Sequence, residues 1–208
     1  MVSTVLNYFK PDSVLDIGAN IGDFYRESKQ MLPEAYYYLI EPNPECQEIL
    51  STLGVDFLIG AVSDKVKEAT FLISTAQYRC TGNSLYRENT SFFADSNVVT
   101  HNLTTTTLDI LFASKDTFFD LIKIDTQGSE LDIIRGGTAV IEKAKGVILE
   151  LAVADYNQGA PKGEEVVKVM TELGFVQLDR LGCNFNPETR ELVHEDYLFI
   201  RKDILNDK

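Results

Sequence analysis

The sequence predicts an α/β fold in which helices cover both faces of a seven-stranded, mostly parallel sheet. Short apolar runs alternate with amphipathic, helix-length segments, as in strands joined by crossover helices. A glycine-containing turn follows the first predicted strand and an acidic residue ends the second, which is typical of nucleotide-binding βαβ units. The length of 208 residues suits one domain, so we predict a single domain over residues 1–208.

The predicted elements are bounded by turn residues and helix caps. Pro44 suits a first helical turn, and Gly54 and Gly174 suit helix ends. The Asn-Pro-Glu-Thr turn at 186–189 lies between the last two strands and predicts that the final strand is antiparallel and inserted into the sheet. The predicted strands are 13–17, 35–40, 56–62, 119–124, 146–151, 175–181 and 197–201, and the predicted helices are 21–31, 44–53, 108–112, 129–143 and 163–173.

Residues 74–106 do not follow this alternation. The segment is rich in Thr, Ser, Asn and Gly and is too long for an ordinary connection, so we predict an insertion that folds over the carboxyl edge of the sheet. The alternative interpretation of this segment is a purely structural or disordered insertion. Its aromatic residues, with Tyr156, either stack on a ligand or anchor the loops. The candidate ligand contacts are Tyr78, Arg79, Asn83, Ser84, Tyr86, Arg87, Phe92, Phe93, His101 and Tyr156.

Charge and cysteine content narrow the function. A formal net charge of −13 disfavours general attraction to nucleic acid or to an anionic membrane. Cys46, Cys80 and Cys183 form no Cys-x-x-Cys pair, which argues against a disulfide framework or a zinc site and favours a reducing cytoplasm. No apolar run approaches the ~18 residues of a membrane span, and residues 1–10 do not have the pattern of a signal peptide.

The turn Asp16-Ile-Gly-Ala-Asn-Ile-Gly22 is the first candidate binding motif. Its glycines permit a sharp turn and a close approach to a ligand, and Glu41 is placed to accept the hydroxyl hydrogens of a ribose. A dinucleotide fingerprint would need glycines at the positions of Asn20 and Asp23. The Gly-x-Asn-x-Gly turn after Asp16 instead resembles the S-adenosylmethionine (SAM) loop of class I methyltransferases. Other Rossmann-like ligands, or a tight turn without a ligand, remain as alternatives.

A second motif places charges on a buried strand. Lys123 and Asp125 lie two residues apart in an apolar run, so they share one side of the strand. Burying an unpaired ion costs several kcal/mol, on the order of the penalties for buried ion pairs. Either these residues belong to a functional site at the carboxyl edge, or a salt bridge from Lys123 to Asp125 or Glu130 only holds the turn together.

With these motifs the chain resembles the FkbM family of SAM-dependent methyltransferases. The resemblance implies a Rossmann-like class I methyltransferase fold and O-methylation of sugars, glycolipids or polyketide-type natural products. One departure is Gln127, where the family usually has Glu. The matching blocks are Asp16-Ile-Gly-Ala-Asn-Ile-Gly22, Glu41-Pro-Asn-Pro44, Leu121-Ile-Lys-Ile-Asp-Thr-Gln-Gly-Ser-Glu130, Arg135-Gly-Gly137 and Val147-Ile-Leu-Glu150.

The resemblance also assigns roles to individual residues. Lys123, Asp125, Glu130 and Glu150 take the positions of the family's strand and helix-start charges. In the cofactor site Glu41 would bind the ribose, and Ala61, Val62 and Ser63 would lie against the adenine. The expected cofactor-binding residues are Asp16, Gly18, Ala19, Asn20, Gly22, Glu41, Pro42, Ala61, Val62, Ser63 and Asp125.

The group that accepts the proton of a hydroxyl nucleophile stays open at this point. Asp125, Glu130, Glu150, His101 and, if burial depresses its pKa, Lys123 are the candidates. His194 is expected to be structural. A divalent cation held by the carboxylates is not favoured. We expect SAM as cofactor, S-adenosylhomocysteine (SAH) as product and a small-molecule acceptor; the rivals are an NAD-dependent oxidoreductase and a non-catalytic binding module.

Overall fold

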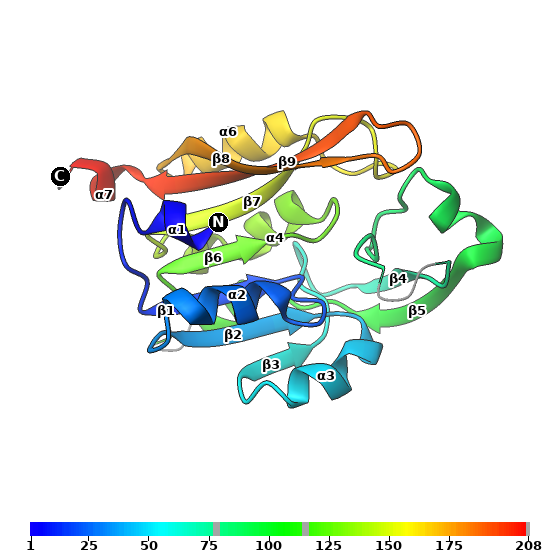
Figure 1. Cartoon of the computed structure of the whole chain (residues 1–208), viewed down its shortest axis with the longest axis horizontal. Helices are drawn as coiled ribbons and strands as arrows, with labels where there is room; N and C mark the ends of the chain where they lie inside the picture. The colour runs from blue at the N-terminus through cyan, green and yellow to red at the C-terminus, as the bar shows by residue number, and fades with distance from the viewer. Residues whose placement is uncertain (77–79, 114–116, 207–208) are drawn as a thin grey trace.

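The structure is a computed structural model that describes residues 1–76, 80–113 and 117–206. Its main sheet contains β1 (Ser13–Ile17), β2 (Tyr36–Glu41), β3 (Asp56–Ile59), β6 (Leu121–Ile124), β7 (Gly146–Ala152), β8 (Phe175–Phe185) and β9 (Leu192–Arg201). The strand order is β3-β2-β1-β6-β7-β9-β8 (Figure 1). Strand β9 is antiparallel to both its neighbours, and the other pairs are parallel. The predicted seven-stranded sheet with one inserted antiparallel strand is confirmed.

Helices pack on both faces of this sheet. They are α1 (Val2–Val5), α2 (Asp23–Met31), α3 (Gln47–Ser51), α4 (Glu130–Gly136), α5 (Thr138–Ile141), α6 (Gly163–Glu172) and α7 (Lys202–Asn206). Short 3-10 turns lie at Pro44–Cys46, Ser91–Phe93 and Asp95–Asn97, and a π-helical turn lies at Asp109–Ala113. Helices α4, α5 and α6 contribute to one apolar core, whereas α1 and α3 contribute to the other. The two cores give the fold its three layers.

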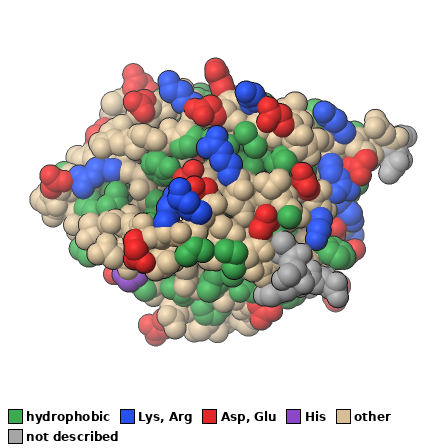
Figure 2. Space-filling view, turned by 180° about the vertical axis from the view of Figure 1, so that it is seen from behind, with side chains coloured by type: hydrophobic (Ala, Val, Ile, Leu, Met, Phe, Trp, Pro, Cys, Tyr) green, Lys and Arg blue, Asp and Glu red, His purple; other side chains and the backbone are tan. Residues whose placement is uncertain are grey.

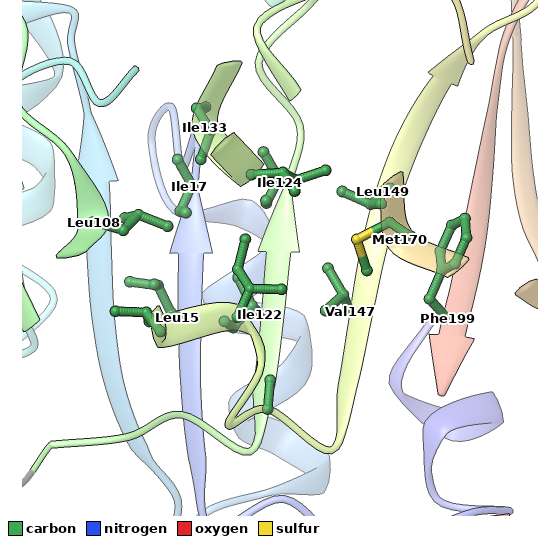
Figure 3. Close-up of a cluster of buried hydrophobic side chains, with 14 of the residues drawn as sticks. Leu15, Ile17, Leu108, Ile122, Ile124, Ile133, Val147, Leu149, Met170 and Phe199 are labelled. Atoms are coloured by element: carbon green, nitrogen blue, oxygen red, sulfur yellow. The ribbon is translucent and has the colours of Figure 1, made fainter. Parts of the chain in front are cut away.

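Strand alternation decides which side chains enter each core. Leu15, Ile122 and Val147 point to the face covered by α4–α6, as Figure 3 shows for this cluster. Their neighbours Val14, Leu121 and Ile148 belong to the opposite core. Because successive side chains alternate, the charged residues of the strands also sort to one face. Asp16, Lys123 and Glu150 follow Val14, Leu121 and Ile148 by two residues, so they share the second face, towards the carboxyl ends of the strands.

The region predicted as an irregular insertion contains part of a small second sheet. Strands β4 (Glu68–Ser74) and β5 (Val98–Thr104) pair antiparallel beside the carboxyl ends of the parallel strands (Figure 1). The sequence analysis missed both strands, because β5 is polar and largely exposed and lacks a clean apolar alternation. The region does reach the carboxyl edge: the Ser84 Oγ lies 3.0 and 2.8 Å from the carbonyl oxygens of Thr126 and Gln127, which follow β6.

The predicted helix at 129–143 is divided in two at Gly136 and Gly137. A Cβ on Gly136 would lie 2.0 Å from the carbonyl oxygen of Ser63, so a glycine is needed where the helix approaches that backbone. Helix α4 ends there and α5 begins at Thr138. Strands β8 and β9 run longer than predicted and meet at the turn that begins with Asn186.

Removal of a core side chain tests this packing. Ile122 is fully buried between β1 and β7, so Ile122→Ala is expected to lower the free energy of unfolding by about 2–5 kcal/mol, from lost burial and the cavity left behind. Met31, which is 44% exposed at the end of α2, is the control. Met31→Ala is expected to change the free energy of unfolding by less than about 0.5 kcal/mol. Urea unfolding followed by circular dichroism measures both. Equal effects would contradict the core described here.

Candidate functional site

The turn between β1 and α2 is shaped by backbone conformations that favour glycine. Gly18 and Gly22 have φ angles of +81° and +86°, and Asn20 also has a positive φ of +50°. The N–H groups of Gly18 and Ala19 both donate to the carbonyl oxygen of Ile40, at 2.9 and 3.1 Å. These bonds tie the turn to the end of β2. A Cβ on Gly18 would lie 1.8 Å from the carbonyl oxygen of Asp125, so the turn packs directly on the chain after β6.

Glu41 ends β2 beneath this turn. Its carboxylate accepts hydrogen bonds from the backbone N–H groups of Asn20, at 2.7 Å, and Asn43, at 2.8 Å. The side chain is buried, and burial raises its pKa from 4.5 to about 7 although the two N–H donors act in the opposite direction. Glu41 is therefore fixed in position with a carboxyl group that titrates near neutral pH.

A cavity of about 520 Å³ opens beside this turn, and we call it the glycine-turn cavity. It lies at the carboxyl ends of β1, β2 and β6, where open α/β sheets bind their ligands. Gly22 and Ser63, also predicted for the cofactor site, do not line it; Gly22 is the N-cap residue of α2, and Ser63 packs under α4. The predicted residues that do line it are Asp16, Gly18, Ala19, Asn20, Glu41, Pro42, Ala61, Val62 and Asp125.

Lys123 is the central cation of the site. Its Nζ donates to Asp125 Oδ2 at 2.9 Å and lies 3.9 Å from Asp16 Oδ1, and its side chain is only 7% exposed. Burial opposes its charge, but the two aspartates outweigh burial and raise the pKa of Lys123. Likewise, burial opposes the charge of Asp125, yet the charge and hydrogen bond of Lys123 lower the pKa of Asp125. Lys123 is therefore a fixed cation, not a group with a depressed pKa.

Asp16 is the least satisfied group near Lys123. It is fully buried, and neither of its carboxylate oxygens has a hydrogen-bond partner among the residues that the structure describes. Burial raises its pKa to about 6, with the charge of Lys123 acting against this shift. Buried polar atoms are seldom left without partners, so these oxygens are available to a donor on a bound ligand.

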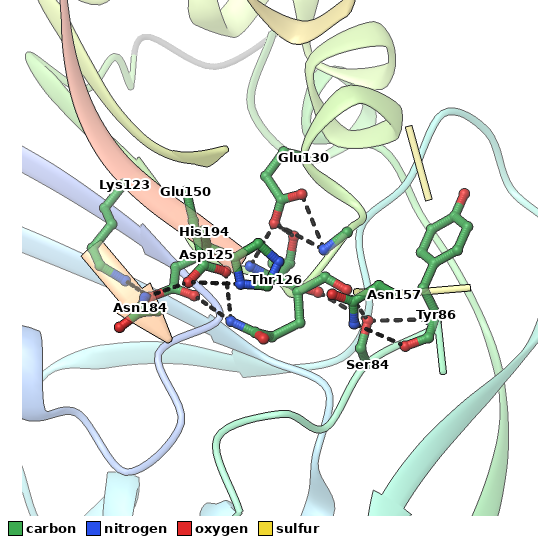
Figure 4. A network of polar contacts seen from close by, with 12 residues as sticks. Ser84, Tyr86, Lys123, Asp125, Thr126, Glu130, Glu150, Asn157, Asn184 and His194 are labelled. Carbon is green, nitrogen blue, oxygen red and sulfur yellow. Dashed lines mark hydrogen bonds and ion pairs between the residues drawn. The ribbon is translucent and has the colours of Figure 1, made fainter. Parts of the chain in front are cut away.

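Glu130 holds the turn between β6 and α4. Its carboxylate accepts hydrogen bonds from the backbone N–H and the hydroxyl of Thr126, at 2.9 and 3.0 Å, and from the N–H of Gly128 (Figure 4). It does not line the glycine-turn cavity. The turn also forces a positive φ of +56° on Gln127. The position of Glu130 thus supports a role in shaping the loop around Asp125.

Glu150, at the end of β7, joins a second set of polar groups (Figure 4). It accepts hydrogen bonds from the side-chain amides of Gln127, at 2.5 Å, and Asn184, at 2.8 Å. Burial raises the pKa of Glu150 well above its ordinary value, and the charge of Asp125 adds to this shift. The His194 Nδ1 lies 3.6 Å from Glu150, and burial lowers the pKa of His194 to about 4, so this imidazole is neutral at pH 7.

These groups border a second cavity of about 590 Å³. Its lining residues come from the 74–106 insertion, from the ends of β6 and β7, and from the β8–β9 hairpin. Asp125 lines both this cavity and the glycine-turn cavity. The lining residues are Cys80, Thr81, Gly82, Glu88, Phe92, Asp125, Gln127, Glu150, Tyr156, Asn184, Phe185, Pro187, Val193 and His194.

The sequence analysis did not identify Glu88, Asn184 and His194 as neighbours of Asp125. No local motif marks them, because they come from distant segments that the insertion and β9 bring together. The one available signal was the predicted insertion of the last strand into the sheet. That strand pairs with β7, so the residue opposite Ala152 lies beside the end of β7. That residue is His194.

The remaining candidates have other positions. His101 is exposed on β5 and lines neither cavity. Tyr86 donates to Asp132, and Arg87 pairs with Asp95, so both anchor the insertion, whereas Asn83 lines the glycine-turn cavity. Phe93 is buried, and Phe92 and Tyr156 line the second cavity. Tyr78 and Arg79 lie outside the described residues.

Among residues 1–76, 80–113 and 117–206, no group of three or more His, Cys, Asp or Glu side chains is arranged to hold a metal ion. Within the same ranges, no helix has both the length and the apolar character needed to cross a bilayer.

The fold and the site define a class of protein. A glycine turn after β1, an acidic residue ending β2 and an antiparallel strand inserted next to β7 are the features of the Rossmann-like class I methyltransferases. Residues 16–176 match the family described as the methyltransferase FkbM domain, and the chain belongs to this family. Comparison with curated proteins gives no match.

Solved structures with the same fold are distant in sequence. Plantazolicin methyltransferase BpumL, in complex with a triazolic desmethylPZN analog and SAH, has a TM-score of 0.54 at 12% identity, over 96% of this chain and 81% of that chain. Precorrin-6y C5,15-methyltransferase from Geobacter metallireducens GS-15 has a TM-score of 0.52 at 12% identity, over 97% of this chain and 87% of that chain. Aeropyrum pernix fibrillarin, with natively bound S-adenosyl-L-methionine, has a TM-score of 0.52 at 10% identity, over 91% of this chain and 66% of that chain. These likenesses show the fold.

The pKa of Glu41 predicts a pH effect on stability. A carboxyl group whose pKa is raised on folding stabilises the fold fully below its unfolded value of 4.5, and this contribution is lost as the pH rises to about 7. The free energy of unfolding of the ligand-free protein should therefore fall across this window. Glu41→Gln should remove up to about 3 kcal/mol of that fall, since one pKa unit corresponds to about 1.4 kcal/mol.

Urea unfolding at a series of pH values measures this contribution. Glu172→Gln, an exposed change at the end of α6, is the matched control and should keep the wild-type pH dependence. A Glu41→Gln curve parallel to the wild-type curve would show that Glu41 does not titrate in this window.

Proposed function

We propose that the protein transfers a methyl group from SAM to a hydroxyl group of a small-molecule acceptor, such as a sugar, a glycolipid or another natural product. The observation that carries this proposal is the position of Asp125, which lines both cavities. A cofactor in the glycine-turn cavity and an acceptor in the second cavity would meet beside this carboxylate. Membership of the FkbM methyltransferase family supports the chemistry, and the resemblance to that family supports a hydroxyl acceptor.

The glycine-turn cavity offers a partner for each polar end of SAM. The two buried oxygens of Asp16 lack hydrogen-bond donors among the described residues, and the ammonium of the cofactor's amino-acid part would supply them. Glu41 accepts two N–H groups, and a carboxylate has about four acceptor positions, which leaves room for the ribose hydroxyls. The apolar walls formed by Pro42, Ala61 and Val62 suit the adenine. The proposed role of Ser63 stays a prediction.

Asp125 is the residue that we propose to orient the acceptor hydroxyl. Bound SAM supplies an electrophilic methyl group, so catalysis depends mainly on holding the nucleophile in line with it. Lys123 keeps Asp125 ionised, and the 32% exposed carboxylate can accept the hydroxyl proton. Glu150 lies in the same cavity and is bonded to Gln127, which also donates to Asp125 Oδ1 at 3.3 Å. The role of Glu150 as a second proton acceptor stays a prediction, because burial raises its pKa well above its ordinary value and so favours the protonated carboxyl group.

Charge and thiol chemistry support the remaining parts of the proposal. Figure 2 shows acidic and basic side chains interspersed on one face, without a continuous basic surface on that face. With a net charge of −13, a small molecule is favoured over nucleic acid as the acceptor. Cys46, Cys80 and Cys183 form no disulfide bond with one another, which supports a reducing compartment, and we propose the cytoplasm.

Isothermal titration of the protein with SAH, and separately with NAD, tests the cofactor. SAH is expected to bind and NAD is not. Glu41→Ala is expected to weaken SAH binding by roughly tenfold to a hundredfold, because it removes a charged hydrogen-bond acceptor. Glu172→Gln should leave the affinity unchanged. NAD binding without SAH binding would favour an oxidoreductase, and binding of neither would favour a non-catalytic module.

Asp125→Asn tests the reaction centre. Once an acceptor has been found by screening hydroxylated compounds with labelled SAM, kcat of this variant is expected to fall about a hundredfold or more, the range for loss of a general base. The SAH affinity should change less than kcat. Glu130→Gln should act mainly through stability, because Glu130 lines neither cavity. An unchanged kcat in Asp125→Asn would contradict the role proposed for this carboxylate.

A further inference from the structure

We propose that the acceptor carries a protonated amine, as in an amino sugar or an aminated natural product, and that Glu88 binds this amine. The inference rests on the proposed function, because it takes the second cavity as the acceptor site. It adds the charge class of the acceptor and a specificity residue that lies outside the motifs of the sequence.

The wall of the second cavity carries a carboxylate, that of Glu88, which no cation balances in the part of the chain that the structure describes. Glu88, Asp125 and Glu150 line it, and no Lys or Arg is among its described lining residues. Lys123 pairs with Asp125 from the side of the glycine-turn cavity, and burial raises the pKa of Glu150 well above its ordinary value. Glu88 is then the carboxylate of this wall that has no ion-pair partner among the described residues. In a partly buried site, this arrangement favours a cationic ligand and disfavours a phosphate or carboxylate.

Glu88 is held in place by neutral donors. It is 7% exposed, accepts a hydrogen bond from Thr90 Oγ1 at 2.6 Å and is hydrogen-bonded to Tyr156. No cationic side chain lies within ion-pair distance of Glu88 in the described part of the chain. A Cβ on Gly82 would lie 2.1 Å from Glu88 Oε2, so the absence of a side chain there makes room for this carboxylate. Glu88 thus presents a positioned and unpaired negative charge.

The other walls fit an organic cation. Phe92, Tyr156 and Phe185 give the cavity aromatic surface, and aromatic rings attract ammonium groups as well as pack against a sugar ring. His194, 3% exposed and packed edge-on against Tyr156, has no hydrogen-bond partner for Nε2 among the described residues. This nitrogen is an unused polar contact in the wall. Because the imidazole is neutral at pH 7, it does not balance the carboxylates.

A metal ion is a poorer match for the same carboxylates. No group of three or more His, Cys, Asp or Glu side chains is arranged to hold a metal within the described ranges. The oxygens of Glu150 are engaged by Gln127 and Asn184, and both of these partners are amide donors that a metal would have to displace. An ammonium group near Glu88 requires no such rearrangement.

The experiment compares three sugars that share a ring and differ in charge. Glucosamine, glucose and glucuronate are titrated into the SAH-saturated wild-type protein, with binding followed by ligand-observed NMR. Glucosamine is expected to bind roughly tenfold or more tightly than glucose, and glucuronate most weakly, as expected for complementary and like charge. The preference should decrease as NaCl is added, because salt screens the interaction.

Two variants assign the effect to Glu88. Glu88→Gln is expected to abolish the preference for glucosamine, whereas Glu172→Gln, which removes the same charge from an exposed helix end, should keep it. SAH should bind Glu88→Gln as it binds the wild type, because Glu88 does not line the glycine-turn cavity, and this binding also shows that the variant is folded. If the variant does not fold, the salt dependence of the wild-type protein tests the proposal instead. A preference for glucosamine that decreases as NaCl is added supports it, and a preference that salt does not change contradicts it.

The outcomes separate this inference from the proposed function. Equal binding of glucose, tighter binding of glucuronate, or no binding of glucosamine to protein that binds SAH would overturn the amine proposal and leave the methyltransferase proposal intact. Absence of SAH binding would instead contradict the proposed function.

Discussion

Buried charge at the carboxyl edge of the sheet is the constraint on which the site depends. Lys123 lies on β6 beside Asp16 of β1 and contacts Asp125 just beyond its own strand. Each ion alone would be costly to bury, and each is tolerated because the opposite charge lies within 4 Å. Two negative groups share one positive group, so the cluster keeps a net negative charge. That charge faces the glycine-turn cavity, where a cationic cofactor would be stabilised by it.

Backbone packing links this cluster to the glycine turn. Gly18 contacts the carbonyl of Asp125, and the N–H groups of Gly18 and Ala19 bond to the end of β2. The turn, Glu41 and Asp125 are therefore positioned by one another and not by separate scaffolds. Below them, the alternation of β1, β6 and β7 keeps apolar side chains in both cores, so the ions occupy only the ends of the strands. The position of the two cavities follows from this division.

The sequence predicted the parts of the fold that have strong local signals. Apolar strands, the glycine turn, Glu41 and the inserted last strand were all identified, since strand periodicity and turn chemistry act over a few residues. Strands β4 and β5 were missed because β5 is polar and exposed, and the break between α4 and α5 was missed because Gly136 is required by the distant Ser63. The Lys123 to Asp125 salt bridge, left open by the sequence, is present together with the cavities, so the structural and functional interpretations are compatible.

The second cavity could not be predicted from local sequence patterns, because its charge arises only when distant segments of the chain come together in the fold. Glu88 comes from the insertion, Glu150 from β7 and His194 from β9, and none stands out in its own segment. Only when β9 pairs with β7 and the insertion folds over the sheet edge do Glu88, Glu150 and the neutral imidazole of His194 line one cavity, with no Lys or Arg among its described lining residues. The glycine-turn cavity is built largely from the turns that follow neighbouring strands, whereas the second cavity, the proposed acceptor site, is built from segments far apart in sequence. The proposed charge preference therefore depends on tertiary structure, and substitutions in those segments are expected to alter it without disturbing the glycine turn.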